Sequence, residues 1–337
     1  MTTVHFVVPD GIDDPARPSG GNSYDRRLAN GLSSIGWSVH EHEVAGFWSD
    51  PDAASFGALG RVIEALPDGA LVLLDGLIAS TAPSVLVPHA NRLRLVVLVH
   101  MPLADEQERE VLSAAAAVIA TSEWSRRRLL ELYGLPPERL HAAEPGACAA
   151  ELAGGSAAGE ALLCVAAVTR LKGHDVLLDA LETITDLSWR CECVGSLDRE
   201  PEFAEALRRR SLVSFAGPRT GAELDESYAA ADLVIVPSRA EAYGMVVTEA
   251  LARGIPVVAS DVGGVTEALG QGGNGNRPGV LVPVDDPAAL GSALRQWLTD
   301  HELRTRLRRA ARERRESLPD WRTTTHTVAS VLEEAAL

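Results

Sequence analysis

Short apolar runs alternate with amphipathic segments along almost the whole chain, and this alternation restricts the fold more than any other feature of the sequence. In the first half the apolar runs lie at residues 4–8, 71–74, 93–99 and 118–120, and Val39 and Val44 lie in a further expected strand region. Runs as dense as 93–99 suit strands of a parallel sheet that helices cover on both faces. Strands that alternate with helices in this way predict an α/β protein with parallel sheets.

A second series of apolar runs begins after a segment that has no clear periodicity. These runs lie at residues 162–168, 189–194, 213–216, 233–237 and 256–259. The separating segment, residues 145–159, is rich in small residues, which indicates a linker between domains. A chain of 337 residues also suggests about two domains. We therefore expect two doubly wound, Rossmann-like domains, at residues 1–150 and 151–320, that face a cleft and bind ligands at the carboxyl ends of their strands.

Two helices of the first domain can be bounded from the sequence. Residues 10–22 are rich in Gly, Pro and Asp, so we expect a loop that contains Gly20 and Gly21, followed by a helix over residues 23–34. Residues 123–133 predict a second helix, which stops at Gly134.

The balance of charges excludes a general affinity for nucleic acid. Lys and Arg total 31 against 47 Asp and Glu, which gives a formal net charge of -16, whereas nucleic acid favours basic surfaces. Seven arginines within residues 304–315 could attach a helix to an anionic membrane surface. The acidic chain favours a solvated helix face instead, so membrane contact is the less favoured alternative.

Cysteine usage and the start of the chain predict a location. Four cysteines without a C-x-x-C arrangement give neither a disulfide framework nor a zinc site, and we expect buried thiols in a reducing compartment. Residues 1–9 lack a basic region and carry only a short apolar run, so no secretory signal is predicted. No apolar stretch approaches the roughly 18 residues needed to cross a bilayer. We therefore expect a cytoplasmic protein.

The densest chemical signal lies at residues 231–267, where an apolar strand, a polar loop and a helix follow one another. The helix is expected to begin near Tyr243 and Gly244 and to end at Gly254. The unpaired N–H groups of its first turn and the helix dipole would attract a phosphate or diphosphate. Gly244 would let that anion approach the backbone closely.

Charged side chains flank this predicted anion site. Glu241 precedes the helix start and Glu249 follows eight residues later, about 12 Å along a helix. This span is similar to the distance from ribose to sugar across a diphosphate, and carboxylates accept hydrogen bonds from hydroxyl pairs. Arg170 and Lys172 follow another apolar strand, where they could clamp a diphosphate and stabilise its charge as it departs. The pattern favours a nucleotide sugar.

Together these segments resemble the retaining glycosyltransferases of family 4 (glycosyl transferases group 1), which have the GT-B fold. The matching motifs are E-x7-E at Glu241 and Glu249, R-x-K-G at 170–173, V-x-F-x-G at 213–217 and G-x-P-V-V-A-S-D-V-G-G at 254–264. Looser matches are the Gly20-Gly21 loop, T-S-E-W-S at 121–125 and E-P-G-A at 144–147. Residues 321–337 resemble the family's final helix, which crosses back onto the first domain.

The resemblance implies a role for each matching residue. Implied in catalysis are Glu241 near the reacting carbon of the sugar, Arg170 and Lys172 on the diphosphate, and His100 beside the donor sugar. Implied in donor binding are Gly20, Gly21, Gly217, Arg219, Tyr243, Gly244, Met245, Val246 and Glu249, with Glu249 on the ribose hydroxyls and Gly217 and Arg219 near the nucleobase. The implied reaction is a hexosyl-type transfer, with retention and without a metal or other cofactor, from a nucleoside-diphosphate sugar to a hydroxyl of a small-molecule or lipid acceptor.

Other segments give no further chemistry. Asp50 and Asp52 form a D-x-D, but they lack the flanking strand of a metal-binding glycosyltransferase motif, and residues 46–52 match no acceptor site. The Gly-rich run at 270–279 lacks the dinucleotide fingerprint and suggests a flexible loop. Two alternatives to the transferase remain: a GT-B enzyme that isomerises a nucleotide sugar, and a non-catalytic partner protein that binds one. Product formation without an acceptor would identify the first, and binding without turnover the second.

Overall fold

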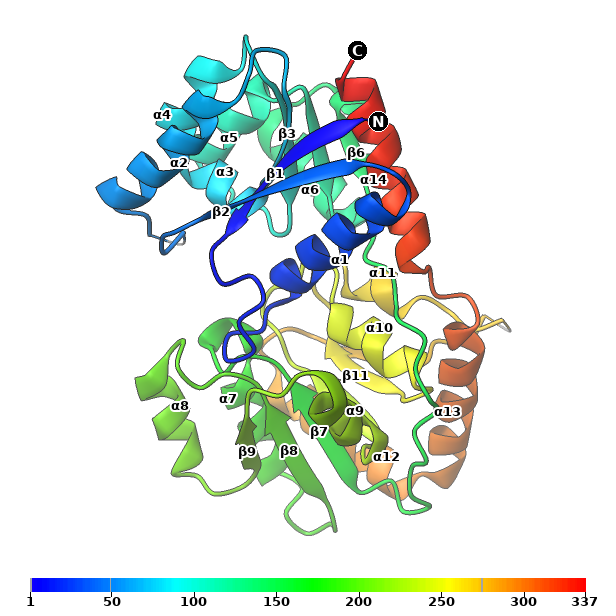
Figure 1. The fold of residues 1–337 in the computed structure, drawn as a ribbon. Coiled ribbons are helices and arrows are strands. Elements are labelled where there is room, and N and C mark those ends of the chain that lie inside the picture. The colour runs from blue at the N-terminus through cyan, green and yellow to red at the C-terminus, as the bar shows by residue number, and fades with distance from the viewer. Residues whose placement is uncertain (1, 49, 274) are drawn as a thin grey trace. The chain divides into compact units, whose positions relative to one another are not determined.

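The computed structural model describes residues 2–48, 50–273 and 275–337. Met1, Ser49 and Asn274, which fall in the predicted first domain, in the 46–52 segment and in the 270–279 run, lie outside the described residues. The chain forms two compact units. The first consists of Met1–Asp13, Gly20–Gly146 and Pro319–Leu337, and the second of Asp14–Ser19 and Ala147–Leu318. Each unit is built on a six-stranded sheet (Figure 1).

The sheet of the first unit is parallel throughout and has the order β2-β1-β3-β4-β5-β6. Its strands are β1 (Thr3–Pro9), β2 (Ser38–Val44), β3 (Leu71–Asp75), β4 (Arg94–Val99), β5 (Ala117–Ala120) and β6 (Leu140–Ala142). Side chains alternate between the two faces, so that Phe6 enters one hydrophobic core and Val7 the other.

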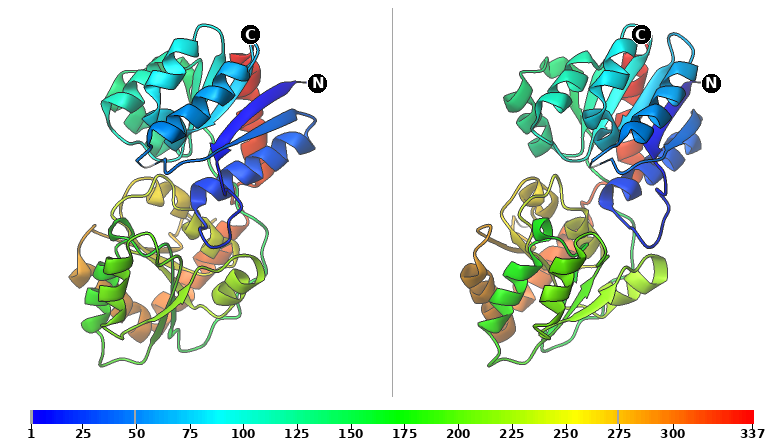
Figure 2. Two further views of the ribbon diagram at one scale, coloured as in Figure 1. Left: turned by 60° about the vertical axis from the view of Figure 1, so that its left-hand side comes forward. Right: turned by 90° about the vertical axis from the view of Figure 1, so that its left-hand side faces the viewer.

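Helices cover both faces of this sheet (Figure 2). The core around Phe6 is closed by α1 (Gly20–Ser34) and α14 (Trp321–Ala335), which contribute Leu28 and Leu332 among other residues. The core around Val7 is closed by α2 (Ala53–Ala65), α3 (Gly76–Thr81), α4 (Pro83–Leu86), α5 (Glu106–Ala114) and α6 (Glu123–Tyr133). The short 3-10 helices η1 (Val87–His89) and η2 (Pro137–Arg139) lie in the connections.

The second unit repeats this plan with the sheet order β12-β11-β10-β7-β8-β9. Its strands, again all parallel, are β7 (Ala161–Val165), β8 (Arg190–Val194), β9 (Ser214–Gly217), β10 (Leu233–Val236), β11 (Val257–Ser260) and β12 (Gly279–Val282). One face is covered by α7 (His174–Glu182), α8 (Pro201–Arg208) and α12 (Pro287–Thr299), and the other by α9 (Gly221–Ala229), α10 (Met245–Ala252) and α11 (Val265–Leu269). Helix α13 (His301–Arg315) contributes to both cores. The prediction of a doubly wound α/β fold is confirmed.

Two local expectations were wrong, and two edge strands were not predicted. Helix α1 begins at Gly20, so Gly20 and Gly21 lie in its first turn and not in a loop. A Cβ at position 21 would stand 3.2 Å from Cδ2 of His100, and this close packing requires a small residue there. The edge strands β6 and β12 were not predicted, because β6 has only three residues with one fully buried side chain and β12 begins at Gly279, within the Gly-rich run that was expected to be a loop. Cys148 is exposed, whereas the other three cysteines are buried free thiols.

The arginines of α13 are structural rather than merely solvated. Arg304 is buried and donates to the carbonyl oxygens of Trp297 and Leu298 at 2.8 and 2.9 Å. Arg308 donates to the buried carboxylate of Asp232 at 2.9 Å. The expectation of a simple solvated face is therefore only partly right. Within the described residues, no helix has both the length and the apolar character that a membrane crossing needs.

Candidate active site

In the second unit, Lys172 and Glu241 form an ion pair at the carboxyl ends of β7 and β10. Lys172 lies in the 3-10 helix η3 (Arg170–Lys172), and its Nζ donates to Oε1 of Glu241 at 2.5 Å. Ser238 Oγ donates to the same oxygen at 2.9 Å. Gly173, with φ of +68°, lets η3 approach β10, because a Cβ there would stand 2.0 Å from the carbonyl oxygen of Pro237. The structure therefore brings together two of the predicted site residues.

The loop from Glu241 to Gly244 is supported by a pair of glycines. A Cβ at Gly263 would stand 1.7 Å from the carbonyl oxygen of Glu241, and the N–H of Gly264 donates to that oxygen at 3.1 Å. The two glycines of the sequence motif therefore pack directly against the Glu241 loop and hold its backbone in place.

The start of α10 offers backbone donors to an anion. Gly244 is the N-cap in the left-handed conformation, with φ of +97°, and as a glycine it contributes no side-chain cap to this end of the helix. Met245 and Val246 form the first helical turn. N–H groups at such an end point along the helix axis and carry the positive end of the helix dipole. The helix begins one or two residues later than predicted, at Met245 rather than near Tyr243.

Glu249 is held in place by residues that the sequence analysis missed. Its Oε2 accepts a hydrogen bond from the hydroxyl of Tyr228 at 2.7 Å. Burial, followed by the charge of Glu249, raises the pKa of Tyr228 well above its usual value, so the hydroxyl stays a donor. Arg253 donates to the carbonyl oxygen of Glu249 at 2.9 Å and lies over the Tyr228 ring at 4.4 Å. Arg253 lies four residues after Glu249, the helical spacing that could have indicated this contact.

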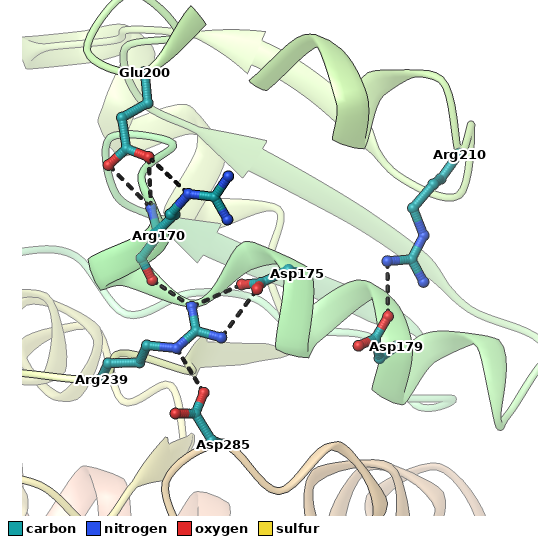
Figure 3. A network of polar contacts seen from close by, with 7 residues as sticks. All are labelled: Arg170, Asp175, Asp179, Glu200, Arg210, Arg239 and Asp285. Atoms are coloured by element: carbon teal, nitrogen blue, oxygen red, sulfur yellow. Dashed lines mark hydrogen bonds and ion pairs between the residues drawn. The ribbon is translucent and has the colours of Figure 1, made fainter. Parts of the chain in front are cut away.

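Arg170 lies beside Glu200 (Figure 3), whereas Lys172 pairs with Glu241. Its side chain is 74% exposed, its Nε lies 3.8 Å from Oε2 of Glu200, and its guanidinium lies 4.9 Å from the ring centre of Phe203. The predicted clamp of Arg170 and Lys172 is therefore not assembled in this structure.

Arg239 is a further residue that the sequence analysis missed. It donates two bonds to Asp175, each of 2.9 Å, and one to Asp285 at 2.6 Å. It also donates to the carbonyl oxygen of Arg170, so it ties η3 to the loop that follows β10 (Figure 3). Its position three residues after a buried strand was the available signal.

The predicted nucleobase region contains a fixed arginine. Gly217 ends β9 with φ of +76°, and Arg219 follows two residues later. The guanidinium of Arg219 donates to Glu192 at 3.1 Å and to Ser227 Oγ at 2.6 Å. Its side chain is thus bound to β8 and α9.

In the first unit, His100 lies at the centre of a buried polar cluster. It follows β4, and its Nε2 lies 2.8 Å from Oδ1 of Asp25 and 3.4 Å from Oδ2 of Asp75. Asp25 is fully buried on α1, one turn after Gly21, and Asp75 ends β3. The other oxygen of Asp75 caps α3 by accepting from the N–H groups of Leu77 and Ile78 at 2.9 and 3.1 Å.

The electrostatics of this cluster favour a charged imidazolium. Burial alone lowers the pKa of His100, but the charge and hydrogen bond of Asp25, with the charge of Asp75, outweigh it and raise the pKa to about 9. Burial and the charge of Asp25 raise the pKa of Asp75 to about 7. The three side chains offer ligand atoms within 4.8 Å of one another. An imidazolium has no lone pair for a metal ion, so the charged form of His100 favours hydrogen bonds to the two carboxylates.

Asp25 and Asp75 were not predicted as site residues. A polar residue that ends the apolar run L-V-L-L-D was a signal for Asp75. Asp25 had no comparable signal, because Gly21 was expected in a loop; in the structure the two lie four residues apart on α1 and so share one face.

These features define the class of the protein. Each unit is a doubly wound parallel sheet with chemical groups at the carboxyl ends of its strands, the plan of the GT-B fold. The sequence model described as glycosyl transferases group 1 matches residues 157–314, and that of the glycosyl transferase 4-like domain matches residues 63–146. The chain belongs to this family of glycosyltransferases, group 1 or family 4, as its motifs indicated.

The matches to curated relatives cover only part of each relative's length. The D-inositol 3-phosphate glycosyltransferase of Kineococcus radiotolerans is 35% identical over 236 residues, which are 61% of this chain and 54% of the relative. The protein of the same name from Thermobispora bispora is 32% identical over 253 residues, 68% of this chain and 58% of the relative. The chain thus spans little more than half the length of these relatives.

Solved structures share the fold over nearly the whole chain. Sucrose-phosphate synthase from Thermosynechococcus elongatus has a TM-score of 0.79 at 22% identity and covers 99% of both chains. HepE from Anabaena, in complex with UDP and glucose, has a TM-score of 0.74 at 18% identity and covers 99% of this chain and all of its own.

Proposed function

We propose that this protein is a retaining, metal-independent glycosyltransferase that moves a hexosyl group from a nucleoside-diphosphate sugar to an acceptor hydroxyl. The observation that carries the proposal is the Lys172–Glu241 ion pair beside the start of a helix whose N-cap, Gly244, has no side chain. A cation and helical N–H groups bind a diphosphate, and a nearby carboxylate binds sugar hydroxyls.

The relatives support the choice of substrates. HepE binds UDP and glucose, and the curated relatives are named for transfer to D-inositol 3-phosphate. We propose a UDP-sugar as the first donor to test, and a small-molecule or lipid hydroxyl as the acceptor. The predicted cytoplasmic location remains part of this proposal.

The proposed chemistry needs no nucleophile from the protein. The bond between the anomeric carbon and the diphosphate oxygen breaks, and a bond from that carbon to the acceptor oxygen forms on the same face. The acceptor proton passes to a diphosphate oxygen. Lys172 and the N–H groups of Met245 and Val246 stabilise the charge of the departing diphosphate. Before the donor binds, Glu241 keeps the Lys172 ammonium at the strand ends.

The other predicted residues take supporting roles in the proposal. Glu249, oriented by Tyr228, binds the ribose hydroxyls, and Glu241 contacts the transferred sugar. The residues that complete donor binding are Gly20, Gly21, Arg170, Gly217, Arg219, Tyr243 and Gly244. His100 donates from an imidazolium to the donor sugar, while Arg170 must leave Glu200 to reach the diphosphate.

Donor binding and turnover are tested in sequence. Thermal unfolding is measured with UDP, GDP, ADP and dTDP, for the wild type and for Lys172→Ala, with Arg208→Ala as an exposed control. A ligand at 100 times its dissociation constant adds about 2.7 kcal/mol to stability. One nucleotide is expected to stabilise the wild type and the control but not Lys172→Ala. Equal stabilisation of all three chains would contradict the proposed site.

Turnover is then followed with the matching nucleotide sugar, with and without EDTA. Proton NMR of the first product is expected to show the anomeric configuration of the donor, at a rate that EDTA does not change. Inverted configuration would contradict retention, and loss of the rate in EDTA would contradict metal independence. Nucleotide binding without product from any acceptor would favour the non-catalytic partner protein.

A further inference from the structure

Three histidines gather on one face of the first unit's sheet, and none of them belongs to the proposed active site. His40 and His42 alternate along β2, and His5 lies on the neighbouring strand β1. In the parallel register His5 stands opposite His40, and Val7 stands opposite His42. Because side chains two residues apart share a face of the sheet, all three imidazoles project from the same face as Val7. Strand β2 is the edge of the sheet.

The His5 ring contacts both of the other rings. The centre of the His5 ring lies 5.2 Å from that of His40 and 5.3 Å from that of His42, with an angle of 28° between the planes in each pair. Nδ1 of His5 lies 3.0 Å from Nε2 of His42. His40 is exposed, and its Nε2 lies 3.2 Å from the hydroxyl oxygen of Ser38.

Among the residues that the structure describes, no carboxylate forms an ion pair or hydrogen bond with these rings, whereas two carboxylates lie beside His100. Glu41 lies between His40 and His42 in sequence but points to the other face, where it pairs with Arg26 of α1 at 2.7 Å. Burial and the neighbouring imidazoles lower the pKa of His5, and burial and His40 lower that of His42. Neutral imidazole nitrogens are ligands for zinc, copper and nickel ions.

We propose that His5, His42 and His40 form a binding site for a divalent transition-metal ion, with Cu(II) and Ni(II) preferred. Two nitrogens 3.0 Å apart, each about 2.05 Å from a metal ion, subtend about 94° at that ion. This angle is close to the right angle of the tetragonal geometry that Cu(II) and Ni(II) adopt with nitrogen and oxygen ligands. His40 supplies the third nitrogen after a rotation of its exposed side chain away from Ser38, and water completes the site.

Binding requires a change of tautomer in the His5–His42 pair. In the metal-free pair, one of the two facing nitrogens carries a proton and donates a hydrogen bond to the other. When a metal ion enters, that proton is lost to solvent while the ring takes up another at its remote nitrogen. Both facing nitrogens then direct lone pairs at the metal, and no net proton is released. The inference does not depend on the proposed glycosyltransferase activity.

The experiment is a titration of the untagged, EDTA-treated protein with CuCl2, followed by calorimetry and by electron paramagnetic resonance. The wild type is expected to bind one Cu(II) per chain, with hyperfine splitting from two or three imidazole nitrogens. His42→Gln and His5→Gln are each expected to weaken this binding at least tenfold, and His40→Gln to remove one nitrogen from the spectrum. His326→Gln, which changes an exposed histidine of α14, is the matched control and is expected to bind as the wild type does.

Two results would overturn the inference. One is a wild-type spectrum with fewer than two nitrogen ligands, which needs no variant and is independent of any folding defect. The other is equal Cu(II) affinity of the wild type and His42→Gln, with thermal unfolding in EDTA verifying that the variant is folded. His40→Gln gives a further check, because the exposed His40 side chain can be replaced without disturbing the core.

Discussion

Replacement of Asp25 by Asn tests the charge state of His100 most directly. In the wild type, His100 is an imidazolium at pH 7 because its pKa is about 9. An amide at position 25 carries no charge, so the strongest influence that raises this pKa is lost, while burial, which lowers it, remains. Loss of an opposite charge at hydrogen-bonding distance lowers a pKa by about 1–3 units. We expect the titration midpoint of His100 to fall by that amount in Asp25→Asn.

The magnitude follows from the raised pKa. The difference between the ordinary value of 6.5 and about 9 corresponds to a preference of about 3 kcal/mol for imidazolium in the folded chain. Because the folded pKa lies above the unfolded one, this stabilisation is complete below pH 6.5 and is lost as the pH rises through 9. We expect the free energy of unfolding of the wild type to fall by about 2–3 kcal/mol between pH 7 and 9.5 from this group, and that of Asp25→Asn to fall much less.

The assay is an NMR titration of protein labelled with 13C at histidine Cε1. The chain has 9 histidines, and the His100 signal is identified by its absence in His100→Gln. Urea unfolding at pH 7 and pH 9.5 supplies the stability difference. Asp68→Asn is the control, because this carboxylate is 85% exposed and pairs with Arg92. A wild-type His100 midpoint at or below 6.5, or equal midpoints in the wild type and Asp25→Asn, would refute the reasoning.

Further predictions concern the same two clusters. Asp75→Asn keeps an acceptor for the α3 cap and removes a carboxyl whose pKa is raised from 3.8 to about 7. The raised pKa destabilises the wild type as the pH rises, so the free energy of unfolding of the variant, relative to the wild type, should increase from pH 5 to pH 8. Urea unfolding that shows the opposite trend would contradict this. Glu249→Ala should weaken nucleotide binding in calorimetry at least tenfold, whereas Glu241→Ala should lower kcat more than it lowers nucleotide affinity. Equal losses of nucleotide affinity in the two variants would exclude this division of roles. Gly263→Ala should destabilise the chain by several kcal/mol because of the contact with the Glu241 carbonyl, whereas Gly36→Ala, at φ of +95° with open space around it, should cost about 1 kcal/mol in urea unfolding; similar costs would show that the contact relaxes.

The sequence was most informative where a pattern is local. The dense run of β4 and the helix at 123–133 could be placed because their signals extend over many neighbouring residues. Strand β6 could not, since it has three residues and its only fully buried side chain is Leu140.

The site divides in the same way. Glu241 and Glu249 were found by their spacing on one loop and helix. The turn of Arg170 towards Glu200 depends on a contact between residues 30 positions apart, and nothing near Arg170 indicates it. The pairing of His100 with Asp25 spans 75 positions and joins a strand end to a helix, so only the folded chain reveals it. The functional roles of these residues remain predictions.

The core around Phe6 also has a consequence for the order in which the protein is made. Val328, Val331 and Leu332 of α14 belong to that core, together with Val4, Phe6 and Leu28. The ribosome synthesises all of residues 147–318 between these two groups. Until residues 319–337 have emerged, the sheet face around Phe6 lacks part of its cover, while residues 147–318 already have nearly all of their own. Proteolysis of nascent chains of increasing length should therefore show protection of residues 147–318 before residues 20–146. The part of the chain that is made first is the last to be completed.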